Sequence, residues 1–315
     1  MAGNAALGRM FGAAEVETFM GIPRCRDLSR LPSRIALIGA DGCTPYPSAG
    51  FHCAGGPAAI RAAAAAYAAS LDHVNFDLGG PVFPAGTDAV DAGDLPQDEA
   101  EPAGNRARIF GAASQVLDRG GVPFLLGGDD SVQIPMIEAF GARGKTYAIL
   151  QVDAHIDWRD EVGGERLGLS STMRRASEMV HVGRIVQVGC RGIGSARDSD
   201  LQDALDRGVE FVPAGEVARD GVWRAADLIP EGAEVIVCLD LDALDPSVMP
   251  AVMARTAGGL SYWQVLELVG AVAEKARIAG FGMVEFMPGR DIDGQGAMLA
   301  AQLLAAAMGV AARQG

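Results

Sequence analysis

The middle of the chain reads YAILQVDAHID (residues 147–157), an apolar run followed directly by three side chains that can bind a metal ion. A run of this kind predicts a buried strand, because the strands of a parallel sheet are covered on both faces. Asp153, His155 and Asp157 then occupy alternate positions, and alternate side chains of an extended segment point the same way. The stretch predicts a parallel strand that ends in a cluster of ligands.

The same arrangement recurs at VIVCLDLDALDP (residues 235–246), where Asp240 and Asp242 follow an apolar run at alternate positions. Carboxylates are rarely buried without a partner, and several of them at buried strand ends repel one another unless cations neutralise them. In open parallel sheets, ligands bind beyond the carboxyl ends of the strands. The two strand ends therefore predict a metal-dependent enzyme with its site at that edge of the sheet.

Strand and helix patterns alternate along most of the remaining chain. The expected strands span residues 34–40, 73–78, 123–126, 147–152, 185–188, 210–212, 235–239 and 281–285. The expected helices span residues 57–70, 106–119, 132–140, 198–207, 262–276 and 294–312, and residues 79–104 are expected to form a loop. This alternation predicts a three-layer α/β/α fold with a doubly wound, mainly parallel sheet. Without a composition break or an internal repeat, residues 1–315 are expected to form a single domain, with residues 1–30 as an N-terminal extension.

The composition is typical of a globular, soluble protein, with 49% hydrophobic and 21% charged residues. The formal charge of -14 disfavours nucleic acid and anionic membranes as partners and would attract a cationic substrate, although solubility explains the acidity equally well. The five cysteines are widely spaced and include no C-x-x-C, so we expect reduced thiols and a cytoplasmic location. Residues 1–20 show no basic stretch followed by a long apolar segment, and the sequence shows no run of about 18 apolar residues. Neither secretion nor a membrane span is therefore predicted.

A third acidic strand end follows the expected strand at residues 123–126, where the chain reads GGDDS (residues 127–131). The glycines allow a tight turn into the next helix. In one interpretation, Asp130 or Ser131 caps that helix, since both residue types are favoured caps. In the other, Asp130 is a metal ligand, and three strand ends supply six ligands for two ions. These six are Asp130, Asp153, His155, Asp157, Asp240 and Asp242.

These motifs resemble those of the ureohydrolase family, which contains arginases, agmatinases and other hydrolases of guanidino groups. The D-A-H-x-D motif at residues 153–157 and the D-x-D-x-x-D-P motif at residues 240–246 carry the resemblance. It extends from FMGIP (residues 19–23) through GGPAAIR (residues 55–61) to DIDG (residues 291–294). The resemblance implies an arginase-like fold, a homo-oligomer that is a trimer or a hexamer, and two divalent ions. Oxygen ligands suit Mn²⁺, with Ni²⁺ as the alternative.

The resemblance also implies how the ligands divide between the two ions. Asp153 and Asp240 would bridge the ions, and Asp245 would lie outside the ligand set. His155 and Asp242 would hold one ion, and Asp157 with Asp130 would hold the other. The family commonly has Gly-Gly-Asp-His-Ser where this chain has Asp130 in the histidine position. Five aspartates carry more negative charge than two divalent ions neutralise, which would favour a guanidinium cation as substrate.

A second departure from the family pattern removes a histidine. Many members carry Ser-His-Gly ahead of an arginine-rich turn, and here Leu169 occupies the histidine position before Arg174 and Arg175. Those two arginines would meet a substrate carboxylate or pair with surface acids, which is the more common arrangement. His181 and His73 are expected to be helix-end or surface residues, so neither replaces the missing histidine.

Glu285 ends the expected strand at residues 281–285, and the resemblance makes it the carboxylate that grips the guanidinium group, a role suited to bidentate pairing. Its alternative partner is Arg290. Trp158 follows the ligand Asp157 and would shape the substrate pocket or cap the sheet. His52 lies in a glycine-rich loop near the expected pocket mouth, where it is a candidate for contact with the substrate.

The predicted reaction is hydrolysis of a guanidino or amidino C–N bond, with Asp157 moving the proton to the departing amine. The expected substrate is agmatine, a guanidino acid, or a smaller guanidine or biguanide. Two other functions are considered. One is a noncatalytic or weakly active partner subunit of a heteromeric ureohydrolase. The other is a single-zinc deacetylase, which is less favoured because it needs fewer ligands.

Overall fold

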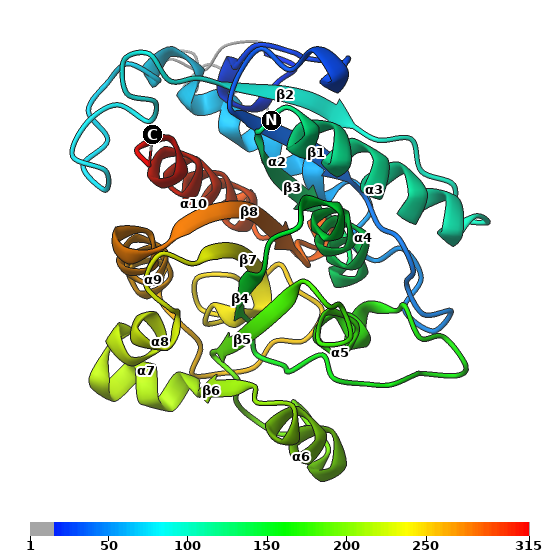
Figure 1. The fold of residues 1–315 in the computed structure, drawn as a ribbon. Helices are drawn as coiled ribbons and strands as arrows, with labels where there is room; N and C mark the ends of the chain where they lie inside the picture. The colour runs from blue at the N-terminus through cyan, green and yellow to red at the C-terminus, as the bar shows by residue number, and fades with distance from the viewer. Residues whose placement is uncertain (1–15, 315) are drawn as a thin grey trace.

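Within residues 16–314, which the computed structural model describes, eight strands form one sheet at the centre of the molecule (Figure 1). The strands are β1 (Ile35–Ala40), β2 (Ala89–Asp94), β3 (Val122–Gly127), β4 (Tyr147–Val152), β5 (Val182–Val188), β6 (Glu210–Val212), β7 (Glu234–Asp240) and β8 (Arg277–Val284). Their order is β2-β1-β3-β8-β7-β4-β5-β6, and every neighbouring pair is parallel. The predicted parallel sheet is confirmed.

Helices cover both faces of this sheet, which confirms the three-layer α/β/α architecture (Figure 1). One layer contains α2 (Gly56–Ala64), α7 (Ala214–Asp220), α8 (Trp223–Leu228), α9 (Tyr262–Lys275) and α10 (Gln295–Ala312). The other contains α3 (Pro102–Asp118), α4 (Gln133–Glu138), α5 (Thr172–Ala176) and α6 (Asp198–Asp206). Short 3₁₀ helices are η1 (Phe19–Gly21), η2 (Leu28–Arg30), η3 (Ala65–Ser70), η4 (Asp130–Val132), η5 (Ala139–Arg143), η6 (Leu169–Ser171), η7 (Leu241–Ala243) and η8 (Pro288–Arg290).

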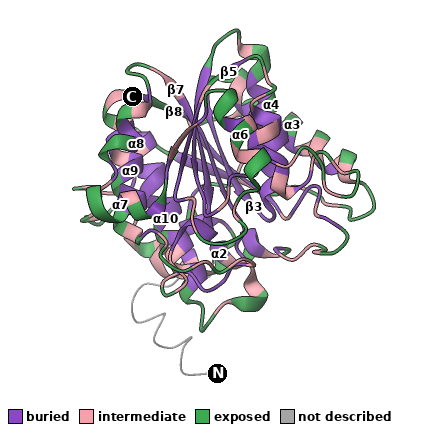
Figure 2. Ribbon diagram, turned by 90° about the horizontal axis from the view of Figure 1, so that it is seen from below, coloured by how far each residue is buried: buried purple, intermediate pink, exposed green. Residues whose placement is uncertain are grey.

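The core lies in two clusters, one on each face of the sheet, and the central strands are buried throughout (Figure 2). In β4, Leu150 and Val152 belong to the cluster under α2, α9 and α10, whereas Tyr147 and Ile149 belong to the cluster under α3 and α4. This alternation follows from the two-residue period of a strand. It explains why the strand sequences are apolar at consecutive positions.

One expected strand is wrong. Residues 73–78 form turns and a single bridge between Asn75 and Gly80, because the Asn75 side chain accepts a hydrogen bond from the Asp77 amide and closes a turn. The strand is instead β2, inside the expected loop at residues 79–104. Its sequence AVDAGD looked like a loop because Asp91 is charged, but this buried carboxylate pairs with Arg61 of α2 at 2.8 Å.

The predicted N-terminal extension is part of the fold as far as the structure describes it. Phe19 is fully buried, and its amide donates to Asp91 Oδ2 at 2.8 Å. Leu28 is buried as well, in the cluster that α3 covers. Residues 1–15 lie outside the described part of the chain.

The C-terminal helix α10 corrects the expectation that no apolar run of membrane-spanning length is present. By length and composition, its 18 residues are apolar enough to cross a membrane, but 72% of them are buried inside the fold. The helix lies between α2 and α9 in the helical layer (Figure 1). A helix covered on most sides by protein is expected to be apolar all round, which accounts for its sequence.

Candidate active site

Four neighbouring strands at the centre of the sheet bring the predicted ligands together. The strands β3, β8, β7 and β4 lie side by side, and their carboxyl ends meet at one edge. Beyond these ends lie Asp130, Glu285, the pair Asp240 and Asp242, and the group Asp153, His155 and Asp157. Residues far apart in the sequence therefore line one cavity at the position where ligands bind in doubly wound sheets.

Two groups of candidate metal ligands share Asp153. One group is Asp153, His155 and Asp242, and the other is Asp130, Asp153 and Asp157, with ligand atoms within 4.8 Å of one another in each group. His155 Nδ1 lies 3.1 Å from Asp242 Oδ2 and 3.4 Å from Asp153 Oδ1. Separations of about 3 Å suit neighbouring ligands around an ion bound at about 2.1 Å. Asp153 is thus common to both groups, as a bridging ligand would be, and the assignment of the ligands to two ions stays a prediction.

Asp240 lines the same cavity but belongs to neither group. Its side chain is buried, and its Oδ1 accepts the Asp242 amide at 2.6 Å. This bond fixes the turn that carries Asp242. The bridging role expected for Asp240 stays a prediction.

Asp130 has the environment of a ligand and not of a helix cap. The cap of η4 is Asp129, whose carboxylate accepts the amides of Ser131 and Cys43. Gln133 donates to Asp130 Oδ1, whereas Asp130 Oδ2 is buried and has no hydrogen-bond partner among residues 16–314. A buried carboxylate oxygen without a partner is costly. A divalent cation would satisfy it, so the residues present fit a metal ion.

The electrostatics of the cluster also fit a bound cation. Burial, reinforced by neighbouring carboxylates, raises the pKa values of Asp130, Asp157 and Asp240 well above the usual range. Burial and the charge of Asp153 raise the pKa of Asp242 to about 6. Burial alone would lower the pKa of His155, but its contacts with Asp153 and Asp242 raise it to about 11. The cluster therefore holds protons unless divalent cations displace them.

These raised pKa values predict that metal-free protein loses stability as the pH rises. A carboxyl group with a raised folded-state pKa stabilises the fold fully below its unfolded pKa, and this contribution disappears as the pH rises through the folded pKa. For Asp242 the window runs from the usual pKa of 3.8 to about 6. The loss from this residue is on the order of 3 kcal/mol.

Thermal unfolding of chelated protein at about pH 5 and about pH 6.5 measures this effect. The melting temperature should be lower at the higher pH, and an excess of Mn²⁺ should raise it most there. His155 does not contribute in this window, because it is charged in both folded and unfolded protein below its usual pKa of 6.5. A melting temperature that rises with pH after chelation contradicts the prediction.

Buried glutamines hold the ligands in place, and the sequence patterns did not reveal them. Gln151 donates to Asp153 Oδ2 at 2.7 Å and to Asp157 Oδ2 at 2.8 Å. Gln187 on β5 donates to Gln151 and to the carbonyl of Ile156. Both side chains are fully buried. The signal was a polar residue inside each apolar strand, because such a residue needs a buried partner.

Replacement of Gln151 by Met is expected to weaken metal binding by about 10- to 100-fold, as is usual when the residue that orients a ligand is lost. The change keeps the volume but leaves Asp153 and Asp157 free to rotate. The affinity is measured by titrating chelated protein with Mn²⁺. The matched control is Gln202→Met, on the exposed surface of α6. Equal affinities for both variants and the unmodified protein would remove Gln151 from the site.

The backbone is strained at two of the predicted catalytic residues. Asp157 has φ 45° and Glu285 has φ 65°, a region that non-glycine residues rarely adopt. Such a conformation costs on the order of 1–3 kcal/mol and persists where the surrounding structure enforces it. At Glu285, the amide donates to the carbonyl of Gly128 at 2.7 Å. Gly128 must be glycine, since a Cβ there would lie 1.5 Å from the Asp41 carbonyl oxygen.

Glu285 is buried and oriented by three donors. Its Oε1 accepts the Asp130 amide at 2.8 Å, and its Oε2 accepts His52 Nε2 at 2.8 Å and Cys53 Sγ at 3.6 Å. The alternative partner Arg290 lies elsewhere and donates to backbone carbonyls. Glu285 is therefore not neutralised by an arginine and can meet a planar cation in the cavity.

The cavity between these residues has a volume of about 130 Å³. This volume is small beside the roughly 300–1,000 Å³ of most ligand pockets. Leu169 and Met253 contribute apolar walls. The lining residues are Asp130, His155, Asp157, Leu169, Ser170, Asp240, Asp242, Met253, Ala254 and Glu285.

Trp158 corrects one prediction, because it does not line this cavity. It is 2% exposed, and its indole N–H donates to Asp203 Oδ2 at 2.7 Å. Positive φ at Asp157 turns the chain here, so the next side chain enters the core under α6. His52 lies behind Glu285 and not at an open pocket mouth, with 5% of its side chain exposed.

The remaining predicted candidates lie away from the cavity. His181 is buried and bonds the carbonyl of Ile137, and His73 is exposed. Arg174 and Arg175 pair with the acids Asp203, Glu178 and Asp160, as the surface interpretation expected. Asp245 accepts the amides of residues 247, 258 and 259, so it shapes a loop outside the ligand set.

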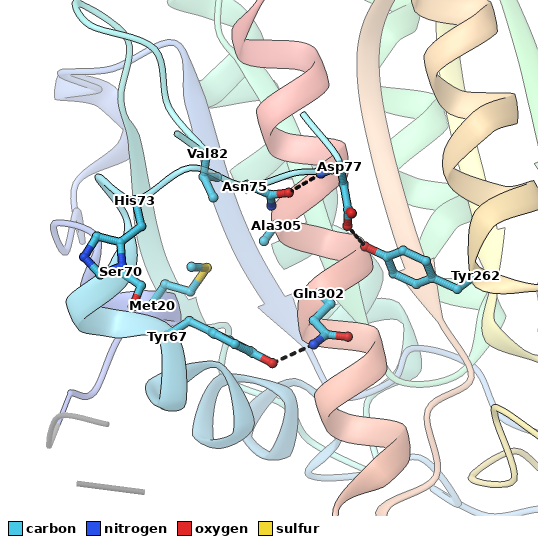
Figure 3. A pocket seen from close by; sticks show the side chains of 10 residues that line it. All are labelled: Met20, Tyr67, Ser70, His73, Asn75, Asp77, Val82, Tyr262, Gln302 and Ala305. Atoms are coloured by element: carbon cyan, nitrogen blue, oxygen red, sulfur yellow. Dashed lines mark hydrogen bonds between the residues drawn. The ribbon is translucent and has the colours of Figure 1, made fainter. Parts of the chain in front are cut away.

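A second cavity, of about 280 Å³, lies between residues 67–82 and the helices α9 and α10 (Figure 3). Two pairs of its polar side chains are hydrogen-bonded: Tyr67 accepts from Gln302, and Asp77 accepts from Tyr262. Asp77 is the single acidic residue in its lining, and none of the candidate metal groups reaches it. The side chains that could bind a metal ion together lie instead at the smaller cavity, beyond the ends of the central strands.

Comparison with known proteins agrees with this arrangement. The model of the arginase family matches residues 34–309. The chain belongs to this family. One relative of this arginase-family chain is N(1)-aminopropylagmatine ureohydrolase of Thermus thermophilus. It is 38% identical to this chain over 185 residues. That match covers 59% of this chain and spans 61% of the length of the relative.

Another relative of this arginase-family chain is similar along most of its length. Proclavaminate amidinohydrolase of Streptomyces clavuligerus is 32% identical over 302 residues, which cover 92% of this chain and 91% of the relative. The solved structure of the enzyme from that organism has a TM-score of 0.80 and 27% identity, and it covers 96% of this chain and 99% of the other. The family and the arginase-like fold predicted from the motifs are thus confirmed.

Proposed function

We propose that this arginase-family chain is a dinuclear-metal hydrolase that cleaves a guanidino C–N bond and releases urea or a urea-like product. The observation that carries this proposal is the position of Glu285, which lines one small cavity together with members of the two ligand groups that share Asp153. The cluster of carboxylates suits divalent cations, and the further buried carboxylate in the same cavity suits a planar cation. The names of the relatives, a ureohydrolase and an amidinohydrolase, support the same reaction class.

Each residue has a distinct part in this reaction. Bound divalent cations, Mn²⁺ or alternatively Ni²⁺, would supply a water activated to attack the guanidino carbon. Glu285 holds the guanidinium group in the plane that its carboxylate defines, because the Asp130 amide and His52 fix both oxygens. Asp157 lines the cavity beside the other ligands, so it is placed to carry a proton to the departing amine.

The cavity favours a short guanidino substrate. Its volume of about 130 Å³ leaves little room beyond the reacting group, and Leu169 makes part of the wall apolar. A longer substrate such as agmatine would have to extend its tail out of this cavity. The five acidic ligands favour a cation over a neutral amide. Guanidino acids, small guanidines and biguanides remain within the proposed class.

The geometry favours catalysis over a noncatalytic partner subunit. A scaffold subunit has no need for the strained backbone at Asp157 and Glu285 or for an unpaired oxygen on Asp130. The proposal includes a cytoplasmic homo-oligomer, as expected from the sequence.

A metal and substrate screen tests the proposal. Chelated protein is reloaded with Mn²⁺ or Ni²⁺, the bound metal is counted, and urea release is measured with agmatine, guanidinobutyrate, guanidine, guanylurea and a biguanide. The expected result is about two ions per chain and urea from at least one compound. Two bound ions without urea from any guanidine, together with activity only after a second chain is added, would favour the partner-subunit alternative.

A further inference from the structure

We propose that His52, Cys53 and Glu285 form a third metal site, which takes a thiophilic divalent cation such as Zn²⁺ and thereby blocks the guanidinium position. The loop between β1 and α2 carries His52 and Cys53, and Glu285 follows β8. The metal-binding part of this inference rests on these three side chains alone. The blocking part rests on the proposed function, because it needs Glu285 to bind the substrate.

The three ligand atoms converge on one point. His52 Nε2 lies 2.8 Å and Cys53 Sγ lies 3.6 Å from the same oxygen, Oε2 of Glu285, and all three atoms lie within 4.8 Å of one another. Tetrahedral Zn²⁺ binds nitrogen and oxygen at about 2.0–2.1 Å and sulfur at about 2.3 Å, which places ligand atoms about 3.3–3.7 Å apart. The sulfur separation already fits, and the His52 nitrogen must move back by about half an ångström.

The surroundings of His52 are those of a metal-binding histidine. Its other ring nitrogen, Nδ1, lies 3.3 Å from the carbonyl oxygen of Gly50. Histidine ligands usually donate that second N–H to a carbonyl or carboxylate, which turns the remaining nitrogen toward the ion. Cys53 is 1% exposed, and 7% of the Glu285 side chain is exposed, so both groups are held by packing. The ligands are therefore oriented before an ion binds.

A divalent ion would leave this buried group without net charge. Its two positive charges are matched by the thiolate of Cys53 and the carboxylate of Glu285, and His52 binds as a neutral ligand. Cys53 and Glu285 are both buried, and burial opposes an isolated charge. The burial that opposes a free thiolate does not oppose this neutral complex.

The sulfur ligand makes this site chemically different from the carboxylate cluster. The two groups that share Asp153 offer oxygen and one histidine nitrogen. Thiolate ligands select zinc, whereas oxygen-rich sites suit manganese. The same chain can therefore hold Mn²⁺ between the strand ends and Zn²⁺ beside them. Because Glu285 serves both Zn²⁺ and the substrate, the two exclude each other.

Cobalt absorption tests the site without any measurement of activity. Protein loaded with Mn²⁺ is titrated with Co²⁺, a spectroscopic substitute for Zn²⁺, and the thiolate-to-cobalt charge-transfer band is followed. We expect a band that saturates at one Co²⁺ per chain and is displaced by Zn²⁺. Cys53→Ser should abolish it, and His52→Asn should weaken the binding of Co²⁺ by at least about 10-fold.

Cys190→Ser is the matched control, because Cys190 lies beside the other cluster, with its sulfur 3.7 Å from the His155 carbonyl. The band should survive this change. Co²⁺ binding by the unmodified protein without a thiolate band overturns the proposal, and so does a band that Cys53→Ser leaves in place. The first of these two results is obtained with the unmodified protein. The test therefore remains decisive even if the Cys53→Ser variant does not fold.

Inhibition kinetics then test the blocking part. In Mn²⁺-loaded enzyme, Zn²⁺ should raise the apparent KM for the guanidino substrate and leave kcat unchanged, and Cys53→Ser should raise the Zn²⁺ inhibition constant by at least about 10-fold. A thiolate band together with urea release that Zn²⁺ does not inhibit competitively would overturn the blocking role. A thiolate band in a protein that hydrolyses no guanidine supports the metal site and counts against the proposed function instead.

Discussion

Replacement of Asp153 by Asn is expected to reduce bound metal to one ion or fewer and to lower kcat/KM for the guanidino substrate by about 10³-fold or more. Asp153 is the carboxylate common to both ligand groups. Changes in residues that only orient ligands cost about 10- to 100-fold, so removal of a shared ligand should cost more. Bound metal is counted after gel filtration, and urea release is measured at saturating Mn²⁺.

Asp153 also affects the pKa values of the neighbouring carboxyl groups. Its charge contributes to the raised pKa values of Asp130, Asp157, Asp240 and Asp242. The variant should therefore remain folded, and its metal-free form should be less sensitive to pH than the unmodified protein. Asp206→Asn, on the exposed surface of α6, is the control for the amide itself. Full activity of Asp153→Asn with two bound ions would remove the dinuclear assignment.

The sequence contains enough information for the sheet because burial leaves a simple pattern. A strand covered on both faces must be apolar at every position, and β4 and β7 show that pattern directly. Strand β2 did not, because its buried Asp91 is neutralised by Arg61, which comes from another element. The local sequence does not show that Asp91 will pair with a residue 30 positions away. The edge strand was therefore predicted at residues 73–78 and not at β2.

The ligands were predictable for the same local reason. Alternate acids after an apolar run place several carboxylates at one strand end, whatever the rest of the chain does. Gln151 and Gln187 were missed because a single amide inside a strand does not reveal which acid it will meet. Trp158 was misplaced because positive φ at Asp157 turns the chain by an amount that residue types do not encode. Contacts between distant residues decide these details.

Replacement of Glu285 by Gln is expected to lower kcat/KM while both ions stay bound. Removal of one partner of a buried charge pair costs about 2–5 kcal/mol, which corresponds to roughly 30- to 4,000-fold. The amide keeps the shape of the side chain, and its oxygen can still accept the Asp130 amide, so folding and the ligand groups should survive. Urea release and metal content are measured on the same preparation, with Glu274→Gln on the exposed surface of α9 as the control.

The two variants separate metal binding from substrate binding. Asp153→Asn should lose metal, and its activity should fail for that reason. Glu285→Gln should keep the metal, and its loss should be largest for substrates that carry a full guanidinium charge, since the carboxylate matches a planar cation. A neutral analogue should be affected less. If Glu285→Gln instead retains the full kcat/KM for a guanidinium substrate, the cation must be bound by the carboxylates of the metal cluster, and the mouth of the cavity rather than Glu285 would select the substrate.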